Sequence, residues 1–216
     1  QFQVGANAGE TIGIDLTQGT TKESIGQIAS AEDLQVASST GGATFSVKVG
    51  SADAVDVSVA EDASAADVAE AISDKNINGI SLVSATNVQD LAFTALSGAG
   101  FTNGGSYTVS LKVGDADAVS VTVEAASGGA VTKDDVATAI QSAGIEGLSV
   151  ETSSSGLKFT VDGGENFSIS ESASTGVTTT GGPGFANAVT TGGGATQFGQ
   201  VSVNALEAFS ITDASG

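Results

Sequence analysis

The chain of 216 residues contains no cysteine, histidine, arginine, methionine or tryptophan, and its only proline is Pro183. Without cysteine it has neither a disulfide framework nor a thiol nucleophile, and without histidine it lacks the commonest general base. A domain of this size without disulfides fits bacterial export better than a eukaryotic secretory route. No apolar run approaches the ~20 residues of a membrane-spanning helix, so we expect no membrane insertion.

Positive charge is also scarce, because six lysines stand against 25 acidic residues and the net charge at pH 7 is -19. Such a chain repels the phosphate backbone of nucleic acids and the surface of anionic lipids. We therefore expect no nucleic acid and no membrane among its partners. The acidity itself is interpreted as a source of solubility and of repulsion between neighbouring molecules.

The remaining acidic residues give little support to catalysis or metal binding. Neighbouring carboxylates occur at 32–33 and 134–135, but these positions are typical of solvated or helix-cap sites. Asp53, Asp115 and Asp117 could offer oxygen ligands to calcium, although their spacing matches no calcium-loop pattern and short acids in turns usually bond their own backbone. We predict a protein that is not an enzyme, with no catalytic residues, no metal site and no cofactor.

Three sequence blocks recur in the same order, 48–59 as 112–123, 67–72 as 135–140, and 77–80 as 145–148. The spacing is 64 residues for the first block (112 minus 48) and 68 for the other two (135 minus 67). A four-residue insertion near 127–129 explains the difference. Matched blocks in one order indicate that the chain carries two copies of one unit.

Each copy has the pattern strand, tight turn, strand, helix, strand, strand. Apolar residues alternate along 45–49 and 55–59, and again along 109–113 and 119–123, which predicts a half-buried antiparallel hairpin in each copy. A further hairpin is predicted in the second copy, with strands 159–161 and 167–169 joined by an Asp-Gly turn.

Helix starts are predicted by paired capping residues. Ser64 precedes Asp67 by three positions, and Thr132 precedes Asp135 by the same spacing, which resembles a capping box. Apolar residues then follow at i, i+3 and i+4, so each short helix can cover the apolar face of its hairpin. Gly79 and its counterpart at 147 are predicted to be turn residues after the helices.

The N-terminal segment 2–16, FQVGANAGETIGIDL, predicts a hairpin and closely resembles the FQVGANxGETIxIDL hairpin of bacterial flagellins. The residues that carry the resemblance are Phe2, Gln3, Val4, Gly5, Ala6, Asn7, Gly9, Glu10, Thr11 and Ile12. The repeated Lys-Val-Gly hairpin followed by Asp-Val-Ala-x-Ala-Ile resembles the insert motif in the outer domains of flagellins and hook-associated proteins. Segment 209–216 resembles the strand that leads back into the C-terminal helices of a flagellin.

The resemblance implies a structural part of the bacterial flagellar filament, namely the exposed, antigenic D2/D3-type outer domains of a flagellin that serves motility outside the cell. Its partners would be other flagellin subunits, bound through terminal helices outside this fragment, and host antibodies or receptors. The fragment itself is expected to be monomeric. An adhesin or binding module of a bacterial surface protein is the alternative, since it would share the β-rich repeats and the acidic surface.

The resemblance also implies O-glycosylation, although composition alone favours a plain polar loop where the candidate acceptors lie. These candidates are Ser172, Ser174, Thr175, Thr178, Thr179 and Thr180.

The predicted fold class is α+β and mainly β. It has two units of β-hairpin, short helix and β-hairpin in an elongated arrangement, with paired terminal strands at the base. The predicted divisions are a core-proximal hairpin and connector at 1–40, a first outer unit at 41–100, a second outer unit at 101–175, and a return segment rich in Gly, Ser and Thr with a closing strand at 176–216.

Overall fold

The computed structural model describes residues 2–3, 11–12, 29–36, 41–96, 105–125, 129–173, 184–185 and 195–213. The helices in these residues are α1 (Ala65–Asp74) and α3 (Lys133–Ala143), and all strand pairs are antiparallel. The predicted class, α+β and mainly β, is therefore confirmed. Neither helix has the length and apolar character needed to span a membrane, and this finding covers only the residues just given.

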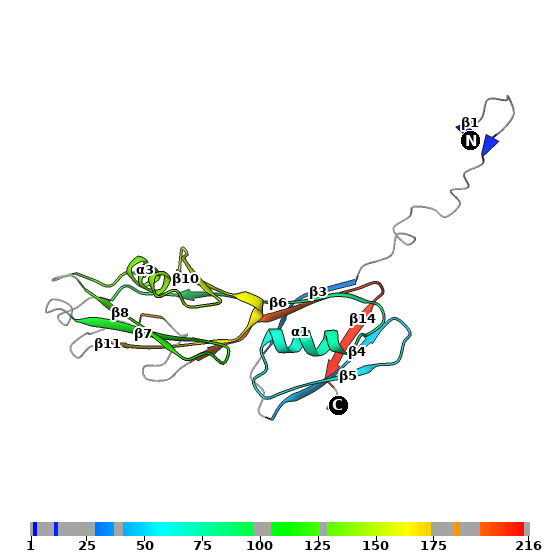
Figure 1. Ribbon diagram of the computed structural model, residues 1–216, viewed down its shortest axis with the longest axis horizontal. Coiled ribbons are helices and arrows are strands. Elements are labelled where there is room, and N and C mark those ends of the chain that lie inside the picture. The colour runs from blue at the N-terminus through cyan, green and yellow to red at the C-terminus, as the bar shows by residue number, and fades with distance from the viewer. Residues whose placement is uncertain are drawn as a thin grey trace.

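The described strands form four sheets (Figure 1). A two-stranded sheet contains β1 (Phe2–Gln3) and β2 (Thr11–Ile12). A five-stranded sheet has the order β3 (Ala29–Gln35), β13 (Gln200–Ala205), β6 (Ile80–Ala92), β10 (Gly156–Val161), β9 (Leu148–Thr152). A four-stranded sheet has the order β12 (Ala195–Gln197), β11 (Phe167–Ala173), β7 (Ser106–Val113), β8 (Val119–Glu124). A three-stranded sheet has the order β14 (Phe209–Asp213), β4 (Ala43–Val49), β5 (Val55–Val59).

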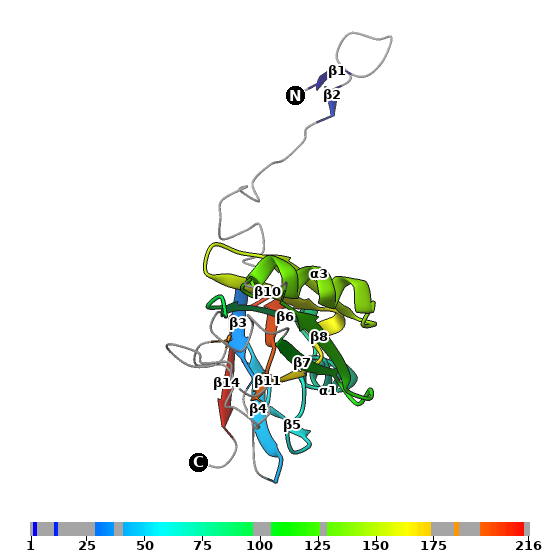
Figure 2. The ribbon, with the colours of Figure 1, turned by 90° about the vertical axis from the view of Figure 1, so that its left-hand side faces the viewer.

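Two units lie end to end, and the long strand β6 runs through both (Figure 1). We define unit 1 as β3, β4, β5, α1, the first half of β6, β13 and β14, which share one apolar core. Unit 2 comprises the second half of β6, β7, β8, α3, β9, β10, β11 and β12, around a larger core. Figure 2 looks along the molecule and shows α3 lying over β8 and β10, which it contacts together with β9.

The chain completes unit 1 only after it has built unit 2. β14 pairs with β4, with Phe209 opposite Val49, in the same way that β11 pairs with β7, with Phe167 opposite Val113. β13 lies between β3 and β6 and bonds to both. Unit 2 is therefore inserted into unit 1 between β6 and β13. The repeated sequence blocks do not predict this nesting, because the closing strands lie outside them.

The predicted hairpins of both copies are present. β4 pairs with β5, with Val47 opposite Val55, and β7 pairs with β8, with Leu111 opposite Val119. One face of each hairpin is buried in the core of its unit, as the alternation of apolar residues predicts.

The further hairpin predicted between 159–161 and 167–169 is wrong. β10 pairs with β6 and β9, whereas β11 pairs with β7 and β12, so the two strands belong to opposite sheets. The short 3-10 turn η1 (Asp162–Gly164) carries the chain from one sheet to the other. Phe159 and Phe167 face each other across the core, with ring centroids 5.4 Å apart. Because the two rings come from facing sheets, each helps to bury the other. Two rings on one face of a single hairpin would need another layer of structure to cover them.

Both predicted capping boxes are present. Ser64 Oγ accepts from the Asp67 N–H at 3.1 Å, and the Asp67 carboxylate accepts from the Ser64 N–H at 2.7 Å. Thr132 and Asp135 form the same pair of bonds at 3.3 and 2.8 Å. Hydrogen bonds from the Thr132 side chain and backbone lower the pKa of Asp135. The spacing therefore predicted where each helix begins, because a cap satisfies backbone N–H groups that have no partner inside the helix.

The glycine after the first helix has a packing reason as well as a conformational one. Gly79 has φ 93°, and a Cβ there would lie 2.7 Å from Val49 Cγ1. Its counterpart Gly147 also has a positive φ, of 71°. Both are turn residues, as predicted. α3 itself ends three residues earlier, at Gly144, which is left-handed with φ 61°.

Each helix should depend on one buried isoleucine, because a helix of about three turns is not stable alone in water. Ile72 and Ile140 are each 2% exposed. Ile72→Ala should lower the free energy of unfolding by roughly 2–5 kcal/mol, measured by urea denaturation. Glu70→Ala on the exposed face of the same helix is the control and should change stability by less than about 0.5 kcal/mol. A loss below about 1 kcal/mol for Ile72→Ala would contradict the packing of α1 on the sheets.

Candidate functional site: the junction between the units

The junction between units 1 and 2 is built around a buried amide on β6. Asn87 is 1% exposed, and its Nδ2 donates to Glu165 O at 2.7 Å and to Gln197 O at 3.0 Å. Its Oδ1 accepts from Gln89 Nε2 at 2.9 Å. One side chain thus holds β6, the turn after β10 and the end of β12 together. All polar atoms of this amide are bonded, which is the condition under which a buried polar group stabilises a fold.

A second amide reinforces the same place. Gln89 Nε2 also donates to Phe198 O at 2.9 Å, in the segment that leads from β12 to β13. The strand that enters unit 2 and the segment that returns from it are therefore bonded side by side. This fixes the ends of the insertion relative to each other.

Glycines allow the backbone of unit 2 to lie directly on β6. A Cβ at Gly164 would lie 2.6 Å from Ala85 Cβ, and a Cβ at Gly199 would lie 2.5 Å from Thr86 O. Contacts this short do not occur for real Cβ atoms, so larger residues would push the units apart. Gly164 also has φ 81°, which a residue with a Cβ rarely adopts.

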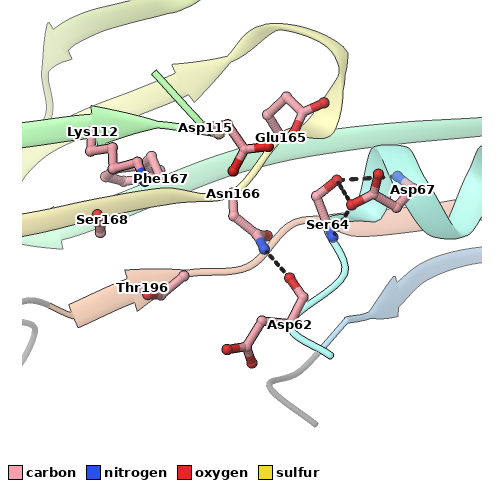
Figure 3. A pocket seen from close by; sticks show the side chains of 11 residues that line it. Asp62, Ser64, Asp67, Lys112, Asp115, Glu165, Asn166, Phe167, Ser168 and Thr196 are labelled. Carbon is pink, nitrogen blue, oxygen red and sulfur yellow. Dashed lines mark hydrogen bonds between the residues drawn. The ribbon is translucent and has the colours of Figure 1, made fainter. Parts of the chain in front are cut away.

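A polar pocket of about 310 Å³ opens beside these contacts (Figure 3). Asn166 of unit 2 donates from Nδ2 to Asp62 O of unit 1 at 3.0 Å and so bridges the two units across it. Four carboxylates and one lysine line the pocket, namely Asp62, Asp67, Asp115, Glu165 and Lys112. The carboxylate of Asp67 is already engaged in the cap of α1, as Figure 3 shows. The pocket therefore offers hydrogen bonding and negative charge.

The turn aspartates considered as calcium ligands do not come together here. Asp115 lines the pocket, whereas Asp53 and Asp117 do not. Among the residues whose placement is described, no group of three or more His, Cys, Asp or Glu side chains is arranged to hold a metal ion.

Unit 2 also buries a carboxyl group in its core. Glu171 is 3% exposed and lies on the inward face of β11. Its Oε2 accepts from the Tyr107 hydroxyl and, at 3.3 Å, from the Phe185 N–H, while its Oε1 has no partner among the described residues. Burial raises the pKa of Glu171, and burial likewise raises the pKa of Tyr107. The carboxyl group is therefore held where its charged form is disfavoured.

The family-motif residues are described only in part. Phe2 pairs with Ile12 and Gln3 with Thr11, which is the pairing expected of the predicted hairpin. The other motif residues, Val4, Gly5, Ala6, Asn7, Gly9 and Glu10, lie outside the described residues.

The other candidate residues lie apart from the junction. Ser172 is exposed on β11 opposite Thr108, whereas Ser174, Thr175, Thr178, Thr179 and Thr180 lie outside the described residues. Of the carboxylate pairs, 32–33 lies exposed on β3 and 134–135 in the first turn of α3.

Sequence reasoning missed Asn87 and Glu171. The signal was available for both, because each lies on the same face of its strand as apolar residues that point into the core. In β11 these residues are Ile169 and Phe167, two and four positions from Glu171, and in β6 Leu91 lies four positions from Asn87. A polar residue at an inward position of such a strand indicates either a side chain that hydrogen-bonds several chain segments or a buried group with a shifted pKa.

Asn87→Ala should weaken the connection between the units, because it removes the side-chain donor that bonds the carbonyls of Glu165 and Gln197. We expect a loss of about 1–3 kcal/mol in the free energy of unfolding. Hydrogen exchange should rise first in the amides of the junction, at the ends of β10, β12 and β13. Thr86→Ala, at the exposed neighbouring position, is the control. Equal exchange in the two variants would mean that the amide does not hold the junction.

Glu171→Gln should change how stability depends on pH. Because burial raises the folded-state pKa of Glu171, its stabilising contribution is complete below the unfolded value of about 4.3 and is lost as the pH rises through the folded value. The variant should therefore gain stability relative to the wild type between pH 4 and pH 7 in urea titrations. Glu151→Gln on the exposed face of β9 should show no such change. A constant difference across this pH range would contradict the assignment.

Comparison with solved structures finds a distant likeness to a flagellar protein. No family model matches the chain, and no curated protein matches it. The chain is similar to the crystal structure of the flagellar cap protein FliD D1-D2-D3 domains from Escherichia coli, with 15% identity and a TM-score of 0.30. The match covers 87% of this chain and 53% of that one, so this chain spans about half the length of that structure. A likeness at this TM-score does not establish a shared fold or a shared function.

Proposed function

We propose that this chain forms the exposed outer domains of a flagellin, a structural subunit of the bacterial flagellar filament outside the cell. The observation that carries the proposal is the run FQVGANAGETIGIDL at 2–16, which closely resembles the hairpin of bacterial flagellins. The pairing of β1 with β2 is compatible with that hairpin. The role of the chain would be mechanical and antigenic, in support of motility.

The architecture of units 1 and 2 supports a structural role. A nested insertion joined by a continuous strand and by the Asn87 amide keeps the two units in register, which suits a rigid projection. The acidic surface would keep neighbouring projections from sticking to one another. Contacts between filament subunits would be made by helices outside this chain, so the 216-residue chain alone should be monomeric. Antibodies and host receptors are its other expected partners.

The proposal is tested in the bacterium that carries the gene. Antibodies raised against residues 29–213 should label filaments along their length in immunogold microscopy. Replacement of 29–213 by a short Gly-Ser linker in the full protein should leave filaments that assemble, are thinner and no longer bind these antibodies. A point variant such as Glu70→Ala is the control and should leave filament diameter unchanged.

The adhesin alternative would be favoured if the antibodies labelled only the cell surface and if the deletion strain formed normal filaments but attached less well. Sedimentation velocity of the isolated chain is an independent measurement. A species of 20.8 kDa agrees with assembly through other regions, and self-association would count against it.

A further inference from the structure

The duplication allows the cores of units 1 and 2 to be compared position by position. The Val36 N–H donates to Gly199 O at 3.1 Å, as the Phe93 N–H donates to Ser155 O at 3.2 Å. Leu34 lies opposite Val201, as Leu91 lies opposite Leu157. Val36 therefore corresponds to Phe93, and the ends of β3 and β6 are equivalent.

Unit 1 has an apolar slot of about 260 Å³ at this place. The slot is lined by Leu34, Val36, Phe45, Val68, Val201 and Ile211, and also by Gln35 and Ile72. By the same registers, the counterparts of the first six in unit 2 are Leu91, Phe93, Val109, Val136, Leu157 and Ile169.

Both sets are apolar, but they differ in burial. All six positions of unit 2 are at most 8% exposed and belong to its continuous core. In unit 1, Val201 is fully buried, but the other five residues are only partly buried. In unit 2, other residues therefore cover these positions and exclude water from them. In the described part of unit 1, the equivalent positions are not covered in this way.

The cover in unit 2 includes a short extended segment with a phenylalanine. Phe185 is 0% exposed, and its ring centroid lies 5.1 Å from that of Phe93 and 6.0 Å from that of Phe159. Its backbone forms an isolated bridge with Phe93, and the Thr94 N–H donates to Gly184 O at 2.7 Å. No isolated bridge is formed at Val36 within the described residues.

We propose that the apolar slot of unit 1 is a docking site for an extended segment of a partner protein that inserts one aromatic side chain. Unit 2 supplies the precedent, since Phe185 occupies the equivalent place there. The volume exceeds the roughly 150 Å³ of a protein cavity that accommodates benzene. The side chains that line the slot carry no charge, so the inserted residue is uncharged, because burying an unpaired charge there would be costly.

The test uses the 216-residue chain and a peptide with the sequence GGPGFAN, which is residues 181–187 of the chain itself. In NMR titrations we expect chemical-shift changes at the slot residues, with a dissociation constant on the order of 1 mM. A peptide with alanine in place of phenylalanine should bind about tenfold more weakly or not at all, because it forfeits the burial of one aromatic side chain.

A variant that completes the likeness to unit 2 provides an independent check. Val36→Phe places in unit 1 the residue that unit 2 has at the equivalent position, where the ring of Phe93 packs against that of Phe185. It should raise the urea midpoint of unfolding and lower the dissociation constant of the phenylalanine peptide. Val88→Phe, at a position of β6 that is 48% exposed, is the matched control and should do neither.

Three results would overturn the proposal. The first is an absence of shifts at the slot at peptide concentrations of several millimolar. The second is equal binding of the alanine peptide, or unchanged binding to Val36→Phe. The third is a set of nuclear Overhauser contacts between the slot and residues 1–28 of the same chain, which would mean that the chain fills its own slot.

Discussion

Unit 1 depends on the pairing of β13 with both β3 and β6. These strands are separated by the whole of unit 2, so the pairing joins residues more than a hundred positions apart, as Val203 opposite Val83 shows. Closing a loop of that length in an unfolded chain has an entropic penalty that local contacts do not repay. Unit 2 reduces the penalty if it folds first, because its own pairing brings the ends of the insertion together. The Asn87 amide then holds those ends, through Glu165 and Gln197, beside the strand that β13 joins.

Two buried polar groups in the molecule illustrate opposite uses of burial. Asn87 and Glu171 are both almost inaccessible, but every polar atom of Asn87 is bonded, whereas Glu171 leaves one carboxylate oxygen without a partner in the described structure. The first group adds specificity, because only one arrangement of the three chain segments satisfies it. The second makes the core of unit 2 sensitive to protonation, because its charged form is poorly solvated there.

Local features of the fold could be predicted from the sequence, and long-range partners could not. The hairpins β4–β5 and β7–β8 and the caps at Ser64 and Thr132 all follow from residues within a few positions of each other. Alternation shows which face of a strand is buried, but it does not show which strand lies beside it. Phe159 and Phe167 both point inward, and this pattern fits one hairpin as well as it fits two facing sheets. The junction escaped prediction for the same reason, since Asn87 acquires its partners only through the nested topology.

Two copies of one unit have equally well packed cores only if the side chains of each copy fill the same total volume. At two aromatic positions of unit 2, unit 1 has smaller residues, with Val36 in place of Phe93 and Ala43 in place of Tyr107, although Phe209 corresponds to Phe167 and Phe45 is larger than its counterpart Val109. Phe185 has no counterpart among the described residues of unit 1. Smaller residues without a compensating segment leave apolar surface in contact with water, which soluble domains retain mainly where something else binds. Equivalent apolar positions are buried in unit 2 by its own residues and are only partly buried in unit 1. This difference is the physical basis for assigning a recognition role to unit 1.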